Sequence, residues 1–451
     1  MAVISLPRFI IRIRQRWLMM ALLAVFIAVS VQYTAKTSDG KRSALIRWIP
    51  AFLEFEAGQN IYDKYLHPNS PTMVLILLPF AHMPPLVAGL TWFYLKAGVT
   101  LLALHWVFRL VESPGQPFPP WAKALAVLLS LDPVLGDLSH GNVNLFILFL
   151  LIAALYVLHR GWEGWAGVLL ALAIDCKVTP ALFVPYLIWK RRWKTLAGCA
   201  IGVPVFLWVM PALVLGFEKN AEFVGSWLHA MIRPFLVEGR VFYSEHNNQS
   251  LPGLIARMLT RGPSFSTYQG DLYVSLEWHN LAALDPRWAA WLVKGCMGAF
   301  AMVVVWACRT PANTKQPWRL AAEYGLVVLG MLLFSERTWK HHCVTLLLPF
   351  AVLCYYLAVC RPGPRLRGYL IGSLAAAVLF MLSTSTGLWR PLDRIGELAQ
   401  VYGAFVWAYL LLAAALIVLL RRKEPLESHR LENPAGVLDV AKAPFFVYKS
   451  P

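Results

Sequence analysis

The sequence predicts an all-α protein that crosses a lipid bilayer many times. Hydrophobic residues make up 58% of its 451 residues and charged residues only 14%, whereas charged residues form about 25% of a typical soluble protein. The apolar residues gather in long continuous runs, and about 20 such residues span the hydrocarbon core of a bilayer. A spanning backbone must hydrogen-bond to itself, so these runs form helices, and they lack the alternation of a membrane β-barrel.

The first apolar run follows a short basic segment. We interpret it as an uncleaved helix rather than a signal peptide, because it is long for a signal peptide and no clear cleavage site follows it. The basic flank places the N-terminus in the cytoplasm. The apolar runs lie near 17–33, 72–83, 86–108, 121–136, 142–158, 164–176, 178–189, 195–215, 287–307, 320–334, 343–359, 368–384 and 400–420.

Lysine and arginine collect in short segments beside these runs. This positive-inside pattern explains the net charge of +17 better than nucleic-acid binding does, since no extended basic domain is present. We therefore expect no nucleic-acid partner. The segments expected in the cytoplasm are 190–194, 309–319, 361–367 and the start of the tail at 421–423.

The number of runs is odd, although both termini are expected in the cytoplasm. One run must therefore be re-entrant or broken, which is tolerated where it is buried in protein. The candidates are 72–83, which is short and followed by two prolines, and 121–136, which Asp132 and Pro133 interrupt. Either choice leaves about 12 transmembrane helices in a single bundle.

We expect one membrane domain with two outer loops. The basic N-terminus and the C-terminal tail are expected in the cytoplasm, and the stretch 43–58 has the helical apolar spacing of a helix that lies in the membrane interface. The seven cysteines form no metal-binding pattern, so no metal site is expected. The boundaries are 1–16 for the N-terminus, 17–420 for the membrane domain, 35–71 and 216–286 for the outer loops, and 421–451 for the tail.

Lys177 is a charge at membrane depth, where insertion costs about 2.5–3.5 kcal/mol. It is either a structural charge paired with Asp175 or a cation that grips an anion such as phosphate. We favour the second interpretation, because Pro180 breaks the helix just after the lysine and opens a polar pocket.

Two further polar segments fall on the same predicted outer face as Lys177. GDLSHGNVN, residues 136–144, precedes an apolar run, where its Asn and Asp side chains are good helix caps, and the outward-facing N-terminus of the helix is also an anion site, so the two interpretations are compatible. SERTWKHH, residues 335–342, has more charge than a connecting loop needs; histidine exchanges protons near neutral pH and arginine holds phosphate. The residues expected to bind substrate are His140, Asn142, Asn144, Arg337, Trp339, His341 and His342.

Two more polar residues lie in the outer loops. Asn248 belongs to a glycosylation sequon, but we interpret it as a substrate-binding group. Asp39 is the first acidic residue after the first helix, and from the residues alone it is a solvated loop carboxylate. Other acidic residues of this loop are its rivals for a catalytic role, namely Glu54, Glu56 and Asp63.

Taken in order, these motifs resemble those of glycosyltransferase family 87, membrane enzymes of the GT-C fold. The resemblance covers about residues 35–350. The sequence departs from the family pattern at Asn142, where the family has glutamine, and in the longer spacing between Asp39 and Tyr62. The matching elements are Asp39, Gly58-Gln59-Asn60-Ile61-Tyr62, an altered Tyr-Pro-Pro element at 67–71, Gly141-Asn142-Val143-Asn144, Lys177 with Pro180, Asn248-Gln249-Ser250 and SERTWKHH.

The resemblance implies a function. Such enzymes move a sugar, typically mannose, from a polyprenyl-phosphate donor to a hydroxyl of a glycolipid or glycan acceptor on the outer face of the cell membrane, with inversion. It implies Asp39 as the base that takes the acceptor proton, and Lys177 as the cation that stabilises the departing lipid phosphate. Arg337, His341 and His342 would assist, Trp339 would stack on the sugar, and no cofactor is needed.

Other functions are compatible with the same residues. A transporter of a lipid-linked or anionic substrate also uses broken helices and midplane charges, although here the polar residues gather at one face. A phosphotransfer enzyme would grip phosphate in the same way, and the unusual Asp39 spacing allows a non-catalytic GT-C-like scaffold. The sugar, the acceptor and the oligomeric state stay open.

Overall fold

The computed structural model describes residues 20, 23–35, 43–65, 67–238, 243–269, 272–386 and 390–422. These residues are helical almost throughout, as expected. The α-helices are Leu23–Ala35, α2 Ala44–Glu56, α3 Ile61–Tyr65, α4 Pro71–Ala81, α5 Pro85–Val111, α6 Pro120–Leu129, α7 Leu131–His140, α8 Asn144–His159, α9 Glu163–Cys176, α10 Phe183–Trp189, α11 Trp193–Pro204, α12 Met210–Leu215, α13 Phe217–Trp227, α14 Arg233–Leu236, α15 Leu251–Leu259, α16 Pro286–Ala307, α17 Pro317–Leu333, α18 Leu347–Val359, α19 Pro364–Ser383, α20 Arg390–Val401 and α21 Ala404–Arg421.

Four short helical turns of other types join these helices. Two are 3₁₀-helices, η1 Thr179–Leu182 and η4 Lys340–Leu346, and two are π-helices, η2 Val205–Val209 and η3 Leu228–Ile232. Helix η1 begins two residues after Lys177, and η4 contains the last three residues of SERTWKHH, so the chain departs from regular α-helix where its unusual polar residues lie.

The expectation of an all-α chain is wrong in one place. Strands β1 (Phe265–Gln269) and β2 (Leu272–Glu277) form an antiparallel hairpin. The hairpin belongs to the outer loop 216–286, which also contains α13, α14 and α15. Residues such as Thr267, Tyr273 and Val274 favour strands, and an interpretation of the segment as a polar loop overlooks this local pattern.

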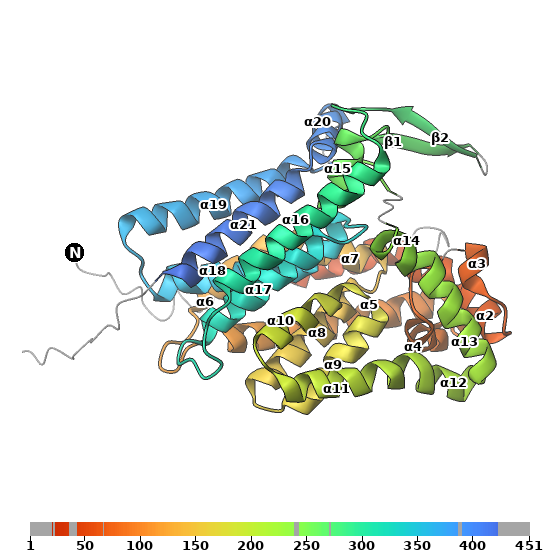
Figure 1. Cartoon of the computed structure of the whole chain (residues 1–451), viewed down its shortest axis with the longest axis horizontal. Helices are drawn as coiled ribbons and strands as arrows, with labels where there is room; N and C mark the ends of the chain where they lie inside the picture. The colour runs from red at the N-terminus through yellow and green to blue at the C-terminus, as the bar shows by residue number, and fades with distance from the viewer. Residues whose placement is uncertain are drawn as a thin grey trace, which may run out of the picture.

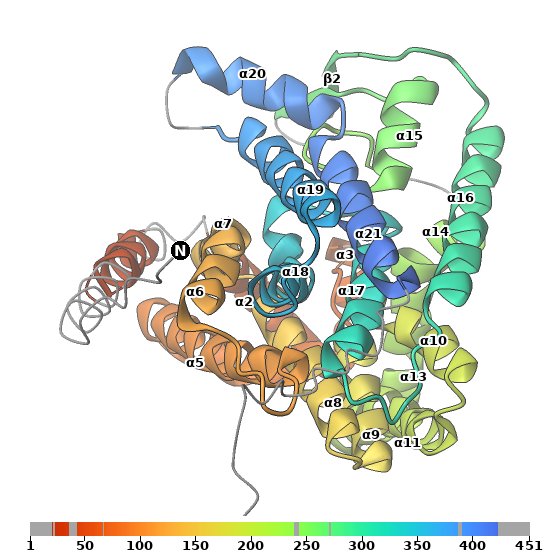
Figure 2. The ribbon, with the colours of Figure 1, turned by 90° about the vertical axis from the view of Figure 1, so that its left-hand side faces the viewer.

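The long helices lie side by side in one bundle (Figure 1). The connections α5–α6, α10–α11, α16–α17 and α18–α19 lie at one end, on the left in Figure 1, and we call it the basic end. The small helices α2, α3, α13 and α20 and the hairpin lie at the other end. Seen along the bundle, α8, α17 and α18 run through the interior, and α11, α16 and α19 lie outside them (Figure 2).

The interior of the bundle is a large apolar core. Almost every residue of α17 is buried, and α8, α18 and α21 also contribute many side chains. The outer helices are less buried: only Ala289, Val293 and Ala307 of α16 are buried. Because α16 is apolar but mostly exposed, its surface suits contact with lipid.

Prolines and small caps begin several of these helices. Proline stands in the first turn of α4, α5, α6, α16, α17 and α19, where its missing N–H costs no hydrogen bond. Ser70 Oγ accepts from Met73 N at the start of α4, and Asp285 accepts from Arg287 N at the start of α16. These caps satisfy N–H groups that a helix start leaves free.

A buried glutamate ties two loops together at the basic end. Glu323 of α17 accepts from Lys190 Nζ at 2.8 Å, from Tyr186 Oη at 2.8 Å and from Thr310 N at 2.6 Å. Lys190 belongs to the segment 190–194, and Thr310 belongs to 309–319. Two segments predicted to share the cytoplasmic side therefore contact the same carboxylate.

Within the residues that the structure describes, six stretches of helix are long and apolar enough to cross a membrane, which supports a multi-pass membrane protein. Several shorter apolar helices accompany them, so the expected number of about 12 crossings stays a prediction. The six stretches are Pro85–Val111, Trp193–Leu215, Pro286–Ala307, Lys340–Val359, Pro364–Ser383 and Ala404–Arg421.

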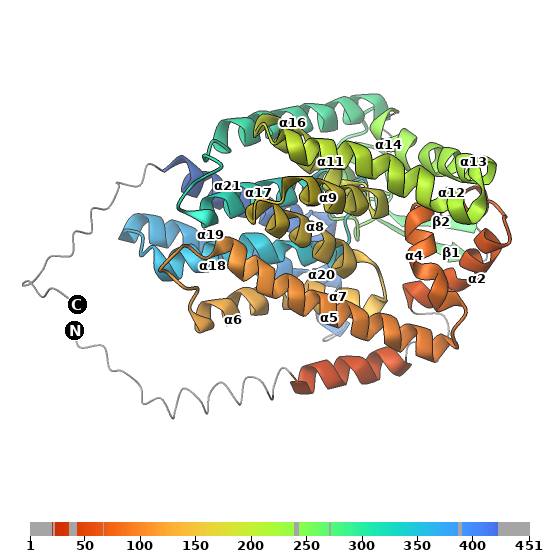
Figure 3. The ribbon, with the colours of Figure 1, turned by 90° about the horizontal axis from the view of Figure 1, so that it is seen from below.

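The two candidates for a non-crossing run differ in their placement. Helix α4 lies beside α2, close to α12 and α13, at one end of the bundle (Figures 1 and 3). Helices α6 and α7 follow each other along the bundle, with a break at Ser130 (Figure 3). This arrangement favours α4 as the run that does not cross.

Candidate active site

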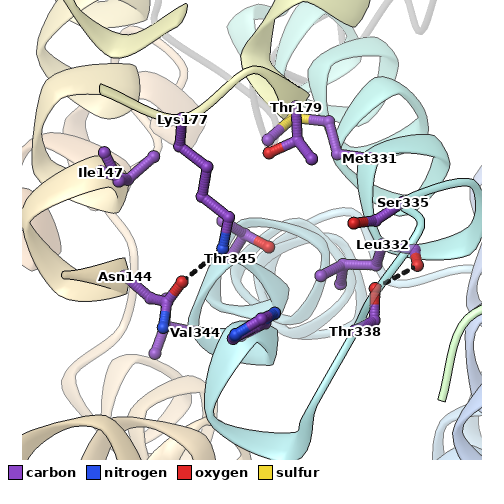
Figure 4. Close-up of a pocket in the computed structure, with 11 residues that line it drawn as sticks. Asn144, Ile147, Lys177, Thr179, Met331, Leu332, Ser335, Thr338, Val344 and Thr345 are labelled. Atoms are coloured by element: carbon purple, nitrogen blue, oxygen red, sulfur yellow. Dashed lines mark hydrogen bonds between the residues drawn. The ribbon is translucent and has the colours of Figure 1, made fainter. Parts of the chain in front are cut away.

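A pocket lies where the predicted site segments meet. It is bordered by the start of α8, the segment between α9 and η1, the end of α17, and η4 (Figure 4). The lining combines one lysine, one histidine, one amide, four hydroxyl side chains and four apolar side chains, and no carboxylate of the described residues is among them. The lining residues are Asn144, Ile147, Lys177, Thr179, Met331, Leu332, Ser335, Thr338, His342, Val344 and Thr345.

Lys177 points across the pocket towards Asn144 (Figure 4). It caps the end of α9 in an extended conformation, just before Pro180 opens the next helix as a 3₁₀ turn. Its Nζ donates to Asn144 Oδ1 at 2.5 Å. Within the described part of the chain Lys177 forms no ion pair, so Asp175 is not its partner. A lysine with only a neutral partner keeps a charge that can attract an anion.

Behind Asn144 lies a buried ion pair. Asp137 of α7 accepts from Asn144 Nδ2 at 2.9 Å and from Lys96 Nζ at 3.2 Å. Lys96 also donates to Asp137 O at 2.7 Å, and both charged side chains are fully buried. Lys96 comes from the middle of α5, so α5, α7 and α8 are joined at this point.

His341 of η4 contacts both polar residues that precede α8. Its ring stacks on His140 with centroids 4.6 Å apart, and its Nε2 lies 3.2 Å from Asn142 Nδ2. Since that amide nitrogen can only donate, Nε2 is the acceptor. His140, Asn142 and His341 are predicted from the sequence to share one site, and the fold brings them together.

Trp339 and His342 extend this cluster into the pocket. The indole ring lies 5.5 Å from the ring of His341 and 5.6 Å from that of His342. Among the described residues, no group accepts a hydrogen bond from the buried Nε1 of Trp339 or bonds to Thr345 Oγ1 on the lining. Buried polar atoms without a hydrogen-bond partner are able to form hydrogen bonds with a bound ligand.

Arg337 turns away from the lining. Its guanidinium lies 4.5 Å from the ring centroid of Tyr243 and pairs with Glu336 at 3.2 Å. Arg337 is about one-third exposed, so it stands at the outer edge of the cluster, next to the loop that precedes α15. The structure therefore separates it from Lys177 and His342, which line the pocket itself.

Asn248 occupies a joint rather than the pocket. Its amide donates to the carbonyls of Tyr243 and Glu336, and its Oδ1 accepts from the N–H groups of Ser250 and Thr338. The side chain is fully buried, and four hydrogen bonds exhaust its capacity. Asn248 thus joins the outer loop to the SERTWKHH segment, which borders the pocket.

Gly141 connects this cluster with the N-terminal part of the chain. It ends α7 with φ of +66°, and a Cβ added there would lie 2.3 Å from Ser43 Oγ and 2.8 Å from Tyr33 Oη. Tyr33 and Ser43 hydrogen-bond to each other at 2.9 Å. Asp39, the predicted base, lies outside the described residues, but the described residues on either side of its segment meet at Gly141.

The three acidic residues that rival Asp39 contact side chains outside the pocket. Glu54 accepts from Lys64 and Tyr65, and these hydrogen bonds lower the pKa of its carboxyl below its ordinary value. Glu56 pairs with His82 at 3.0 Å, and Asp63 lies 3.5 Å from Ser226 Oγ. None of the three lines the pocket.

Lys96 is not among the site residues predicted from the sequence. The signal was present, since a lysine in the middle of the apolar run 86–108 needs a partner as much as Lys177 does. Asp137 was noted in its motif but was not chosen as a site residue. Thr179, Ser335, Thr338 and Thr345 were also missed, because a hydroxyl beside an apolar run is too common to stand out.

Residues 66–335 match the profile of glycosyltransferase family 87. Two curated relatives are described as polyprenol-phosphate-mannose-dependent alpha-(1-2)-phosphatidylinositol mannoside mannosyltransferases. The one from Mycobacterium tuberculosis is 24% identical over 72% of this chain and 71% of its own length. The one from Mycolicibacterium smegmatis is 25% identical over 70% of this chain and 65% of its own length.

A third relative, a pentamannoside mannosyltransferase of Mycobacterium tuberculosis, is 26% identical over 54% of this chain and 48% of its own length. No solved structure matches the chain. The family profile covers more than half of the sequence, including the motifs around Asn144, Lys177 and Asn248. The chain therefore belongs to glycosyltransferase family 87, the family that its motifs resemble.

Proposed function

We propose that the protein transfers mannose from a polyprenyl-phosphate donor to a hydroxyl of a glycolipid acceptor, at the non-cytoplasmic face of the membrane and with inversion. The observation that carries this proposal is the pocket around Lys177, which has a cation and several hydroxyls but no described carboxylate in its lining. The three relatives, whose names specify polyprenol-phosphate-mannose, support the choice of donor.

The donor phosphate fits the chemistry of this pocket. Its bond to the sugar breaks during transfer, and the negative charge that develops on the phosphate needs stabilisation rather than a proton. Lys177 Nζ supplies a positive charge, and the hydroxyls of Thr179 and Thr345 supply further hydrogen-bond donors. The polyprenyl chain would remain in the lipid beside the helices.

The acceptor would enter from the side of the histidine cluster. Trp339 and the exposed His140 offer flat rings, and sugars pack well on aromatic faces. Asp39 remains the proposed base, because an inverting transfer needs a carboxylate opposite the leaving group to take the hydroxyl proton. In support, Tyr33 and Ser43 on either side of its segment contact Gly141, next to Asn142.

The test uses the full-length protein in liposomes. Radiolabelled polyprenyl-phosphate mannose is supplied with phosphatidylinositol mannoside, the acceptor that the relatives' names suggest, and with other membrane glycolipids in parallel. We expect a labelled glycolipid whose new linkage has the opposite anomeric configuration to the donor, as measured by NMR. Asp39→Asn should abolish labelling while thermal unfolding in detergent stays unchanged.

Three other outcomes would contradict parts of the proposal. Normal transfer by Asp39→Asn would exclude that residue as the base. Retention of configuration would exclude direct displacement. Movement of donor across sealed vesicles without any covalent product would favour the transporter alternative and overturn the proposed function as a whole.

A further inference from the structure

The ion pair Lys96–Asp137 lies behind the pocket and does not line it. Both side chains are fully buried, and the charged atoms lie 3.2 Å apart. Taking two charges out of water is costly, and a buried pair rarely improves stability over an apolar pair of the same size. A charge pair at membrane depth therefore indicates a role beyond holding helices together.

The contacts of Asp137 show what that role is. Its carboxylate accepts from Lys96 Nζ, from Asn144 Nδ2 and from Leu145 N, which is 3.3 Å away. A carboxylate can only accept hydrogen bonds, so it selects the NH₂ group of Asn144. The carbonyl Oδ1 of Asn144 must then point the other way, into the pocket, where it accepts from Lys177.

The pair also controls the charge that acts on Lys177. Lys96 balances Asp137, so the pair is neutral as a unit and leaves the positive charge of Lys177 uncancelled. Without Lys96, the negative charge of Asp137 would act on Lys177 across a single amide. Opposite charges at this range attract strongly in a medium of low polarity, and Lys177 would then bind an added anion less well.

We propose that Lys96 and Asp137 are positioning residues for the lipid phosphate of the donor. Asp137 sets the orientation of Asn144, Asn144 holds Lys177 in the pocket through its carbonyl, and Lys96 keeps Asp137 from competing with the phosphate for Lys177. This inference rests on the proposed function and deepens it, because it gives a role in donor binding to two residues that act through Asn144 and Lys177 and do not contact the donor.

The test compares single and double variants in the liposome assay. Lys96→Met leaves Asp137 without its cation and should raise the KM for polyprenyl-phosphate mannose about tenfold or more, with a smaller change in kcat. The double variant Lys96→Met/Asp137→Asn removes both charges, and the amide oxygen introduced at position 137 can still accept from Asn144. This variant should recover most of the donor affinity. A purely structural role predicts that the loss and the rescue appear in the unfolding temperature, with the donor KM unchanged in both variants.

A matched control comes from the other buried ion pair. Lys190→Met breaks the Lys190–Glu323 pair at the basic end and should lower the unfolding temperature without changing the donor KM. Equal donor KM values for wild type and Lys96→Met, or a double variant no better than the single one, would overturn the inference. If the wild type itself transfers no mannose, the proposed function fails instead, so the two failures are distinguishable.

Asn144→Asp gives an independent measurement. The new carboxylate would pair directly with Lys177 and face Asp137, so binding of polyprenyl phosphate without a sugar should weaken about tenfold or more. Binding is followed by the protection of Lys177 from amine-reactive labelling. Undiminished protection in Asn144→Asp would contradict the idea that the neutral carbonyl keeps Lys177 available.

Discussion

The two ends of the bundle each contain a buried lysine near a buried acid, but they use the charges differently. At the basic end, Glu323 takes three short hydrogen bonds and its lysine also donates to a backbone carbonyl. Around the pocket, the pair Lys96–Asp137 is separated from Lys177 by the side chain of Asn144. Lys177 lines the pocket and hydrogen-bonds to this neutral side chain. The first arrangement is saturated and structural, whereas the second leaves a cation for a ligand.

The largest expected effect separates Lys177 at the pocket from Lys190 at the basic end. Lys177→Met should lower kcat/KM for mannose transfer by about 10²–10³-fold, because it removes the charge that stabilises the departing phosphate. Its unfolding temperature should stay near that of the wild type, since Lys177 has no ion-pair partner in the described structure. Transfer is measured with labelled donor and folding by thermal unfolding in detergent.

Lys190→Met should do the reverse. Breaking a buried pair by removing one partner costs about 3–5 kcal/mol of stability, because Glu323 is left without its cation. Transfer per folded molecule should remain at the wild-type level. If Lys190→Met lost transfer while Lys177→Met kept it, the assignment of a structural end and a ligand-binding end would be reversed.

A glycine substitution tests the contact between the pocket cluster and the N-terminal part. Gly141→Ala forces alanine into the left-handed region, at about 1–2 kcal/mol, and drives its Cβ into Ser43 and Tyr33. We expect lower stability and a clear loss of kcat, because the contact beside the Asp39 segment is displaced.

Gly115→Ala is the matched control for this prediction. Gly115 has a similar φ of +75°, but a Cβ there meets nothing within 4 Å. It should share the backbone strain and keep its kcat. If both variants lost the same fraction of kcat, the contact at Gly141 would have no specific role in transfer.

Asn248→Ala tests whether Asn248 joins two segments of the chain or binds substrate. The variant removes the side-chain hydrogen bonds to backbone groups of Tyr243, Glu336 and Thr338, which are half-buried or buried, at a cost of about 1–3 kcal/mol. We expect a lower unfolding temperature with little change in KM for donor or acceptor. Asn142→Ala, which loses the contact to His341, should instead raise the KM for the donor or for the acceptor, with little loss of stability.

Much of this arrangement was predictable from the sequence, since charges inside apolar runs are costly and few. That reasoning selected Lys177, Asn144 and His342, which come from distant parts of the chain and line one pocket. The runs themselves predicted the helices. The sequence left 72–83 and 121–136 as candidates for the run that does not cross, and the placement of α4 at one end of the bundle favours 72–83.

The rest depends on distances that a sequence does not contain. Lys96 and Asp137 are far apart in the chain, and only the packing of α5 on α7 shows that they pair. Asn248 lies in a polar segment that is typical of a ligand-binding loop, but the four hydrogen bonds of its side chain all join it to backbone groups of the chain itself. The hairpin is stabilised by local strand pairing, which a helix-centred analysis of apolar runs does not detect.

The smallest expected effect concerns a rival for the catalytic base. Glu54 is held by Lys64 and Tyr65, and these hydrogen bonds lower the pKa of its carboxyl from an ordinary value of 4.5. A carboxylate with a lowered pKa is a weaker base, so Glu54→Gln should transfer mannose at nearly the wild-type rate at pH 7, in contrast to Asp39→Asn.

The pH dependence of stability gives Glu54 a signature of its own. A carboxyl whose pKa is lower in the folded state contributes stability above its unfolded pKa, and this contribution is lost as the pH falls through the folded pKa. Thermal unfolding of wild type and Glu54→Gln should therefore differ slightly at pH 7, and the two should converge as the pH falls through the lowered folded-state pKa of Glu54. A Glu54→Gln variant that stays folded but loses transfer would make Glu54, rather than Asp39, the residue that takes the acceptor proton, and would move the reaction from the Gly141 contact to helix α2.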